Sequence, residues 1–483
     1  MAIKDELADF ILAKFPYEAT PEQLDVVGRW CDFLTSPKRD EVFLLRGYAG
    51  TGKTSLVGAL VKSLHALHRP VVLLAPTGRA AKVFALHAGH VAYTIHKKIY
   101  RQKTFSAEMT NFQANYNNHK HTLFIVDEAS MISNEGVSGR MFGTGRLLDD
   151  LIHYVYSGEG CRLMLVGDSA QLPPVGEELS PALSEVALAG YGLEVCQARL
   201  TQVVRQIEES GILWNATMLR RLISTDEMAN FPRFKVQGFP DVKVVPGEDL
   251  IELLEESYYR CGTDDTIVVT RSNRRANLFN NGIRSRILMY EDELTAGDQL
   301  IVVKNNYYWA SQTDDEKSTD FIANGDVCVV RRYRNERTLY GFRFVDATLR
   351  FPDFDDMELE TTVLLDTLQS EAPALTQEQQ SALFNAVCAD YPGITNRRDL
   401  MKKIKEDIYY NALQIKYSYA ITCHKAQGGQ WKRVFVDQGY VTRDMLSPDY
   451  FRWLYTALTR ATETLYLVNW PSEQVDYNES LPI

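Results

Sequence analysis

The chain has 483 residues, a length that usually divides into two to four structural units. Its hydrophobic fraction of 45% and charged fraction of 24% are those of a folded globular protein and exclude a fibrous or disordered chain. The formal net charge of −11 excludes a global positive field, so any nucleic-acid contact must be local.

The N-terminal segment alternates charged and apolar residues at helical spacing, unlike a secretory signal peptide. No run reaches the roughly 18 apolar residues of a membrane span. The seven cysteines are scattered and contain no Cys-x-x-Cys pair, which favours reduced thiols over a zinc or disulfide framework. We therefore expect a cytoplasmic protein.

A helix is predicted to begin after Thr20, with Thr20 as its cap and Pro21 as its first residue. Gln23 lies one turn later, where its amide could read the edge of an adenine. An ordinary amphipathic helix explains the same residues equally well.

Four short apolar runs at 42–46, 71–75, 123–126 and 162–166 predict buried parallel strands joined by helices. A second set of three runs predicts another, similar α/β domain that is built from two separated pieces of sequence. These three runs lie at 266–270, 433–436 and 464–468.

The first run leads into GYAGTGKT at 47–54, which fits the phosphate-binding pattern G-x-x-x-x-G-K-[ST] between a strand and a helix. Glycines let the backbone N–H groups and the helix N-terminus face phosphates, Lys53 neutralises the outer phosphates, and the Thr54 hydroxyl suits Mg²⁺. The residues expected to bind ATP are Gly47, Ala49, Gly50, Thr51, Gly52, Lys53, Thr54 and Ser55.

Asp127 and Glu128 follow the apolar run at 123–126 and supply the carboxylates that such a site needs. We expect Asp127 to hold the Mg²⁺ shell and Glu128 to orient or deprotonate the attacking water. ATP hydrolysis with Mg²⁺ is the predicted chemistry.

From about 291 to 413 the sequence pattern changes to short stretches in which apolar and polar residues alternate. The Asn-Gly pair at Asn324 and Gly325 interrupts them. This pattern predicts antiparallel hairpins in a small β-barrel. An acidic strip at 353–360 and a basic cluster at 397–405 are expected to be solvated surface.

Six further segments occur in a fixed order and, with the phosphate loop and the acidic pair, resemble the RecD and Dda-like branch of helicase superfamily 1. They are APTGRAA at 75–81, TIH at 94–96, VGDSAQLPPVG at 166–176, LTQVVRQ at 200–206, YAITCHKAQGGQW at 419–431 and YTALTRA at 455–461. The resemblance covers nearly the whole chain. Members of this branch move 5′ to 3′ on single-stranded DNA.

The resemblance implies an α/β fold with two RecA-like P-loop NTPase motor domains, each carrying a small insertion. The first motor domain would span 1–215, with a pin-like hairpin at 97–122. The second would combine 216–290 and 414–483, with an SH3-like β-barrel and a helical extension at 291–413. The pin would brace against this barrel.

The resemblance also implies that Gln171 senses the γ-phosphate and that Arg205 and Arg460 reach the nucleotide from the second domain. The DNA contacts that it implies are Pro76, Thr77, Arg79, Thr94, His96, Thr422, His424 and Lys425. Such residues suit phosphate and sugar contacts without reading base sequence. His96 and His424 could instead be structural histidines.

An aromatic residue of the pin, Phe105, Phe112 or Tyr116, could stack on the terminal base pair, although an ordinary loop is nearly as good an interpretation. The short segment before the phosphate loop favours the free-standing Dda type over a subunit of a recombination complex. The implied function is an ATP-dependent DNA helicase that acts as a monomer on single-stranded DNA and duplex junctions. Two alternatives remain open: an RNA-translocating relative, or a nucleotide-gated DNA clamp that does not unwind.

Overall fold

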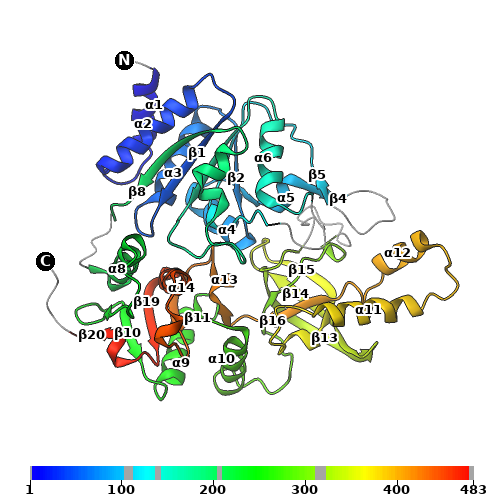
Figure 1. Ribbon diagram of the computed structural model, residues 1–483. Coiled ribbons are helices and arrows are strands. Elements are labelled where there is room, and N and C mark those ends of the chain that lie inside the picture. Colours follow the sequence, from blue (N-terminus) through cyan, green and yellow to red (C-terminus); the bar gives the residue numbers. More distant parts are fainter. Residues whose placement is uncertain (1–2, 103–111, 136–142, 204–208, 311–321, 478–483) are drawn as a thin grey trace.

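The computed structural model describes the chain except residues 1–2, 103–111, 136–142, 204–208, 311–321 and 478–483 (Figure 1). Two parallel sheets, each covered by helices, lie one above the other in this view, and a barrel with a helical arm lies beside them. No helix among the described residues has the length and apolar character needed to cross a bilayer.

The first sheet has six strands in the order β3-β2-β6-β7-β1-β8, and every pair in it is parallel. Its central strands are buried along nearly their whole length, which explains their continuous apolar runs. The strands are β1 (Glu41–Gly47), β2 (Val71–Ala75), β3 (Ala92–Thr94), β6 (Leu123–Val126), β7 (Arg162–Gly167) and β8 (Glu194–Leu200). The helices around it include α1 (Ile3–Leu12), α2 (Pro21–Thr35), α3 (Lys53–Ala66), α4 (Gly78–Ala88) and α6 (Leu147–Ser157).

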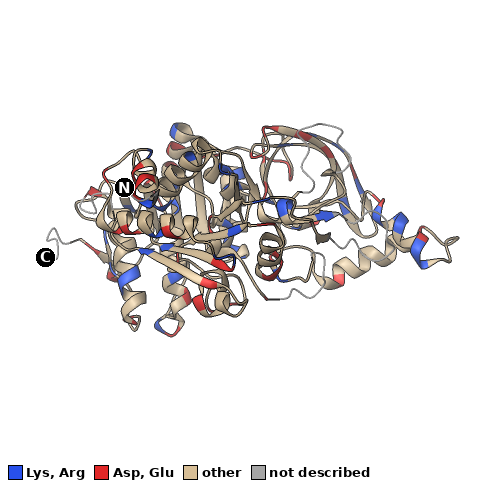
Figure 2. Ribbon diagram, turned by 90° about the horizontal axis from the view of Figure 1, so that it is seen from above, with Lys and Arg blue, Asp and Glu red and all other residues tan. Residues whose placement is uncertain are grey.

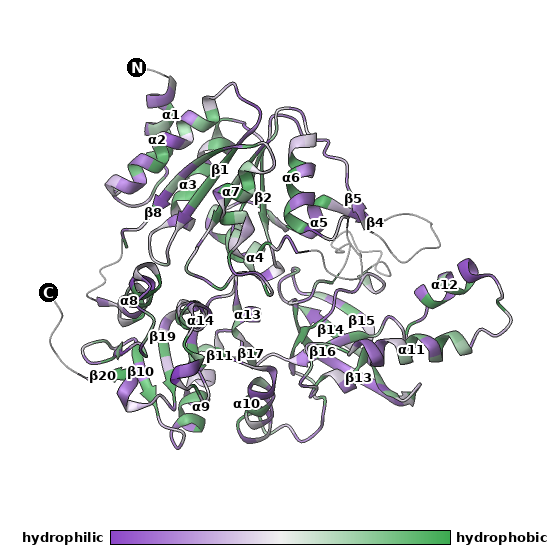
Figure 3. Ribbon diagram, in the orientation of Figure 1, coloured by the Kyte–Doolittle hydropathy of each residue, from purple (hydrophilic) through white to green (hydrophobic). Residues whose placement is uncertain are grey.

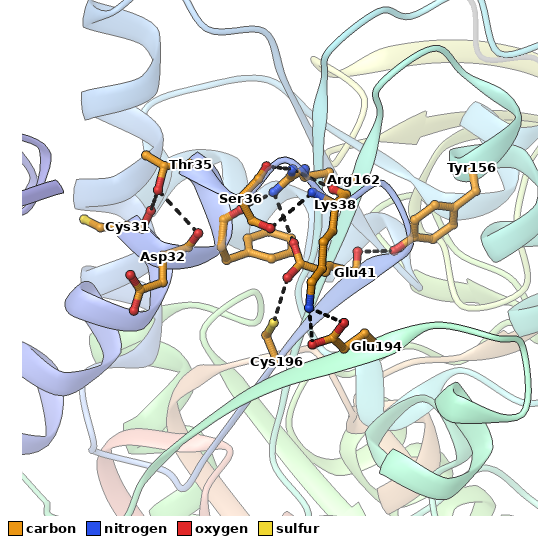
Figure 4. Close-up of polar contacts among 11 residues, drawn as sticks. Cys31, Asp32, Thr35, Ser36, Lys38, Glu41, Tyr156, Arg162, Glu194 and Cys196 are labelled. Carbon is orange, nitrogen blue, oxygen red and sulfur yellow. Dashed lines mark hydrogen bonds and ion pairs between the residues drawn. The ribbon is translucent and has the colours of Figure 1, made fainter. Parts of the chain in front are cut away.

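The end of α2 is fastened to this sheet by Arg162 at the start of β7 (Figure 4). The Arg162 guanidinium donates to the backbone carbonyls of Phe33, Ser36 and Lys38, which are exposed where the helix ends. The Tyr156 hydroxyl donates to the carbonyl of Glu41 at 2.7 Å. A cavity of about 710 Å³ lies beside this junction, at the edge of the sheet where its strands begin.

The second sheet has five parallel strands in the order β10-β19-β18-β11-β17. They are β10 (Val242–Val245), β11 (Thr266–Thr270), β17 (Ala420–Thr422), β18 (Trp431–Asp437) and β19 (Ala461–Val468). Its helices include α8 (Gly211–Thr225), α9 (Leu250–Cys261), α10 (Asn273–Arg286) and α14 (Pro448–Leu458). Figure 3 shows hydrophobic strands inside both sheets and mixed hydropathy on the surrounding helices.

Five strands form the closed barrel: β12 (Gln299–Val302), β13 (Val327–Leu339), β14 (Phe342–Phe351), β15 (Met357–Leu364) and β16 (Leu413–Tyr417). The tight hairpin turn lies at Tyr340 and Gly341, whose φ values of 58° and 79° suit a two-residue turn. Asn324 and Gly325 lie instead in the connection before β13. The Asn-Gly pair therefore indicated the barrel correctly but did not mark its tight turn.

A helical arm extends from the barrel and consists of α11 (Gln377–Ala389) and α12 (Arg397–Lys405). The basic residues of α12 colour the far part of this arm in Figure 2, while acidic and basic residues mix over the rest of the ribbon. The arm packs on the barrel through a small apolar cluster that includes Leu383, Val387 and Ile404.

A short antiparallel hairpin, β4 (Tyr100–Gln102) and β5 (Phe112–Ala114), follows α5 (Ile95–Ile99) in the first half of the chain. Tyr307 of the barrel insertion packs into the same apolar cluster as Ile99 and Tyr100 at the base of this hairpin. Residues 103–111, including Phe105, lie outside the described part of the chain. The contact therefore concerns the base of the predicted pin and leaves its wedge residue untested.

The fold class is confirmed: an α/β chain with two parallel sheets, a hairpin in the first unit and a closed barrel in the second. Two expected boundaries fall inside elements. The boundary at 215 lies within α8, where buried Asn215 bonds to the backbone of Lys235, and the boundary at 413 lies within β16. We propose boundaries before 211 and after 417, because a continuous helix or barrel strand belongs to one unit.

Candidate nucleotide site and nucleic-acid channel

The phosphate loop connects β1 to α3 and is shaped by glycines in the left-handed region. Gly50 has φ 77° and Gly52, which precedes the first residue of α3, has φ 81°. A Cβ atom on Gly47 would lie 2.8 Å from the Lys53 side chain. The loop thus wraps closely around Lys53, whose Nζ donates to the carbonyl of Tyr48 at 2.8 Å.

The acidic pair lies where β6 ends, as expected. Burial and the charge of Glu128 raise the pKa of Asp127, while the charge of Lys53 acts in the opposite direction. Glu128 has φ 53° and ψ 37°, a left-handed conformation that is uncommon for this residue type and occurs often at functional sites. A divalent cation beside Asp127 would offset the burial that disfavours its ionised form.

Gln171 lies in the turn after β7, and only 7% of its surface is exposed. Its Oε1 atom has no hydrogen-bond partner among the described residues. Buried amide oxygens are rarely left without a partner, so this atom fits a site that a ligand or its metal completes. Together with the glycine-rich loop, Lys53 and Asp127, it forms a chemically suitable place for a nucleoside triphosphate and Mg²⁺.

Gln23 lies in the first turn of α2, which Thr20 caps as expected. It is fully buried, its Oε1 accepts from the backbone N–H of Thr20, and its Nε2 donates to the carbonyl of Thr51 at 3.1 Å. The side chain therefore links the start of α2 to the phosphate loop. Adenine recognition by Gln23 stays a prediction.

Two arginines were expected to reach the nucleotide. Arg205 lies outside the described residues. Arg460 is buried, and its guanidinium donates to the carbonyls of Thr456 at 3.0 Å and Gly429 at 3.2 Å. Both contacts lie within the second domain, so a reach to the nucleotide requires these contacts to change.

Sequence reasoning missed two second-domain residues that contact the phosphate loop. The Arg220 guanidinium of α8 lies 4.4 Å from the ring centroid of Tyr48. The Tyr455 hydroxyl of α14 accepts from the backbone N–H of Ala49 at 2.9 Å. Tyr455 is the first residue of the YTALTRA segment, so that segment was the available signal, whereas nothing in the sequence around Arg220 indicated a role.

A pocket of about 230 Å³ lies where the first motor domain, the second motor domain and the barrel meet. It brings together four predicted nucleic-acid contacts: Thr77, Arg79, His424 and Lys425. The described lining does not include the other four, Pro76, Thr94, His96 and Thr422. The barrel adds Gln299, Ile301, Asn324 and Gly325, which sequence reasoning had not assigned to a nucleic-acid site.

Several of these side chains also have structural roles. The Thr77 and Thr94 hydroxyls cap α4 and α5 by accepting from the backbone N–H groups of Ala80 and Lys97, each at 3.2 Å. The Arg79 guanidinium stacks on Trp431 at 4.2 Å and donates to the carbonyl of Gln430 at 3.2 Å, which joins the two motor domains.

Burial lowers the pKa of three of the predicted nucleic-acid contacts, two histidines and a lysine. It lowers the pKa of His96 to about 4, and it also lowers the pKa of His424. Both imidazoles are therefore mainly neutral near pH 7 and suit hydrogen bonding better than charge pairing. Burial, followed by the nearby charge of Lys416, lowers the pKa of Lys425 to about 8.

The barrel also contacts the first motor domain directly. The Lys82 Nζ atom of α4 donates to the carbonyl of Pro352 at 2.8 Å and lies 3.2 Å from a carboxylate oxygen of Asp353. The acidic strip expected to be solvated thus includes a contact between domains. Residues of both motor domains and of the barrel together line the pocket.

Two family models match the chain, an AAA domain at residues 19–235 and a UvrD-like helicase C-terminal domain at 417–468. The chain is 24% identical over 440 residues to the ATP-dependent RecD2 DNA helicase of Deinococcus radiodurans. That match covers 88% of this chain but 46% of the relative, so the chain spans about half the length of that protein. It is also 22% identical over 505 residues to the uncharacterized protein R530 of Acanthamoeba polyphaga mimivirus, covering 88% of this chain and 94% of that one.

Among solved structures, the chain is similar to the Pif1 helicase from Bacteroides in complex with ADP-AlF3 and ssDNA. The identity is 15%, the TM-score is 0.46, and the match covers 95% of this chain and 94% of that one. The chain is also similar to the Pif1 helicase from Candida albicans, with an identity of 16% and a TM-score of 0.42. That match covers 96% of this chain and 97% of that one.

Proposed function

The chain belongs to the RecD-like branch of superfamily 1, a branch of ATP-dependent DNA helicases. From that premise we propose that it moves 5′ to 3′ on single-stranded DNA and unwinds duplex at junctions. The direction of movement follows from the family, and one observation supports coupling between the two sites. Gln427, two residues after Lys425 of the channel, donates through Nε2 to the carbonyl of Leu172 at 2.7 Å, next to Gln171 of the nucleotide site. A single short segment thus contacts both proposed sites.

The nucleotide is hydrolysed in the cleft between the two motor domains. Lys53 and the glycine-rich loop hold the phosphates, and Thr54 and Asp127 hold Mg²⁺, which supplies charge neutralisation at the phosphates. Glu128 orients the attacking water, and the unpartnered Oε1 of Gln171 can accept from that water while its Nε2 donates to the γ-phosphate. Arg460 and Arg205 add positive charge once the cleft closes.

The single-stranded DNA lies in the pocket between the two motor domains and the barrel, and it is held through its phosphates and sugars. Thr77 and Arg79 contact it from the first domain, and His424 and Lys425 contact it from the second, with Thr422 beside the pocket. Pro76, Thr94 and His96 extend the contact surface beyond the pocket. Alternate opening and closing of the cleft moves the two sets relative to each other, so the strand advances stepwise.

We propose that one chain is sufficient for this activity, because both halves of the nucleotide site come from the same chain. Tyr307 packs at the base of the β4–β5 hairpin, which supports the proposal that this hairpin separates the duplex ahead of the DNA strand. The cytoplasm is the compartment in which we expect the protein to act.

ATPase rates measured with single-stranded DNA, with RNA and without nucleic acid test the proposal. We expect DNA to stimulate hydrolysis strongly and RNA weakly. Equal stimulation by RNA would instead support an RNA-translocating relative. DNA-stimulated hydrolysis without strand separation on any tailed duplex would support a nucleotide-gated clamp.

A further inference from the structure

One buried hydroxyl group of the second motor domain joins two parts of the nucleotide site in the first. Tyr455 lies near the end of α14, and 1% of its surface is exposed. Its hydroxyl accepts from the backbone N–H of Ala49 at 2.9 Å and donates to Oδ2 of Asp168 at 2.6 Å. The phosphate loop and the turn after β7 are therefore connected through a residue that neither of them contains.

Asp168 determines the shape of the turn that carries Gln171. Its Oδ1 atom accepts from the backbone N–H of Ala170 at 2.9 Å, and its carbonyl accepts from the N–H of Gln171 at 3.3 Å. Asp168 is 1% exposed, and a buried carboxylate needs such donors to offset its lost hydration. The Tyr455 hydroxyl is one of these donors, so it helps to fix the turn that positions Gln171.

The next residue of α14 contacts the same turn. The backbone N–H of Leu172 donates to the Thr456 hydroxyl at 2.9 Å, and the Leu172 carbonyl accepts from Gln427. Gln427 lies at the end of α13 (Cys423–Ala426), the short helix that carries His424 and Lys425. Hydrogen bonds and the backbone link between Thr456 and Tyr455 thus connect α13 to the phosphate loop.

Apolar packing keeps these contacts together. Ala170 and Leu172 of the first domain belong to the core cluster of the second domain, and Ala49 packs against that cluster. The Tyr455 hydroxyl lies inside this apolar interface, where a hydrogen bond is stronger than in water. Burial, together with the negative charge of Asp168, raises the pKa of Tyr455, so the hydroxyl keeps its proton and remains a donor.

We propose that Tyr455 is a positioning residue that couples nucleic-acid binding to ATP hydrolysis, by holding the phosphate loop and the Gln171 turn in one arrangement. This inference rests on the proposed function. The Tyr455 hydroxyl has two partners, the backbone N–H of Ala49 in the phosphate loop and the carboxylate of Asp168 in the Gln171 turn. Nucleic acid bound at His424 and Lys425 shifts α13 and α14, and the shared hydroxyl transmits that shift to Gln171.

The substitution Tyr455→Phe tests this inference, because it keeps the ring and its packing and removes only the hydroxyl. Tyr450→Phe is the matched control. Tyr450 lies on the same helix, is also buried, and donates its hydroxyl to Gln438 within the second domain at 2.7 Å. The measurements are kcat and the KM for ATP, each with and without single-stranded DNA, together with the melting temperature.

We expect the DNA-stimulated kcat of Tyr455→Phe to be about 10- to 100-fold lower than that of wild type. This is the effect typical of losing a hydrogen bond to a charged group. The kcat without DNA should fall by a smaller factor, because the Ala49 N–H loses its acceptor while Lys53 is unchanged, so the ratio of DNA-stimulated to unstimulated kcat should decrease. Tyr450→Phe should keep the full stimulation. Asp168→Asn, which keeps the shape but weakens the bond to Tyr455, should reproduce the loss if Tyr455→Phe does not fold.

Two results would overturn the inference: stimulation by DNA that equals wild type in Tyr455→Phe, or a loss of kcat that is the same with and without DNA. The second result would indicate a purely structural hydroxyl. Failure of the proposed function would look different, because then wild type itself would show no stimulation by single-stranded DNA.

Discussion

The barrel is joined to the second motor domain by an ion pair that is buried and bidentate. The Nε and Nη2 atoms of Arg284 in α10 each lie 2.8 Å from an oxygen of Asp298, the residue before β12. The two side chains are 7% and 0% exposed. The same guanidinium also donates to the carbonyl of Asp292 at 2.7 Å. This arrangement fixes the barrel wall of the channel relative to the second domain.

We therefore expect Arg284→Met to destabilise the protein by about 3–5 kcal/mol, because it leaves the Asp298 carboxylate buried without its charge partner. Arg332→Met is a matched control on the same barrel. Arg332 pairs with Glu360 at 2.6 Å, but these side chains are 68% and 65% exposed, so its loss should cost under about 1 kcal/mol. Urea denaturation of both variants, followed by fluorescence, gives the comparison.

A rigid junction also has a functional consequence. Arg284→Met should weaken binding of single-stranded DNA, because Gln299 and Ile301, directly after Asp298, line the channel. Equal urea midpoints for Arg284→Met and Arg332→Met would refute the claim that this ion pair holds the barrel in place.

The remaining predictions concern the two sites. Lys53→Ala should abolish ATP hydrolysis with an unchanged melting temperature, because no other described side chain of the loop carries a positive charge; retained turnover would remove the site assignment. Glu128→Gln should still bind ATP but hydrolyse it roughly 100-fold or more slowly, as expected for loss of a general base, and wild-type turnover would place the base elsewhere. The pKa of Lys425 is lowered to about 8, so this side chain is charged below that pH and neutral above it. Affinity for single-stranded DNA should therefore fall between pH 7 and pH 9 in wild type and much less in Lys425→Arg, and identical pH profiles would show that Lys425 makes no phosphate contact.

Local patterns in the sequence predicted much of the fold. Continuous apolar runs such as 71–75 and 123–126 are buried strands because both faces of a parallel sheet are covered. The edge strand β8 was not predicted, since Glu194–Leu200 alternates polar and apolar residues and is only partly buried. The phosphate loop and the acidic pair were recognisable because their spacing alone fixes their geometry.

Contacts between distant segments could not be predicted in this way. Ala49 and Tyr455 are 406 residues apart, and no local pattern reports their hydrogen bond. The same holds for Gln23, whose amide binds the loop carbonyl of Thr51, and for Arg460, whose guanidinium faces carbonyls of its own domain. The sequence identified residue types suited to the chemistry, whereas their orientation depends on packing between domains.

The measurement that tests the central claim most directly is unwinding of three duplexes that carry a 5′ tail, a 3′ tail or no tail, with ATP and Mg²⁺. We predict strand separation only with the 5′ tail, and none by Lys53→Ala. A strict requirement for a 3′ tail would contradict the proposed direction of movement, and no separation of any duplex would contradict helicase action itself.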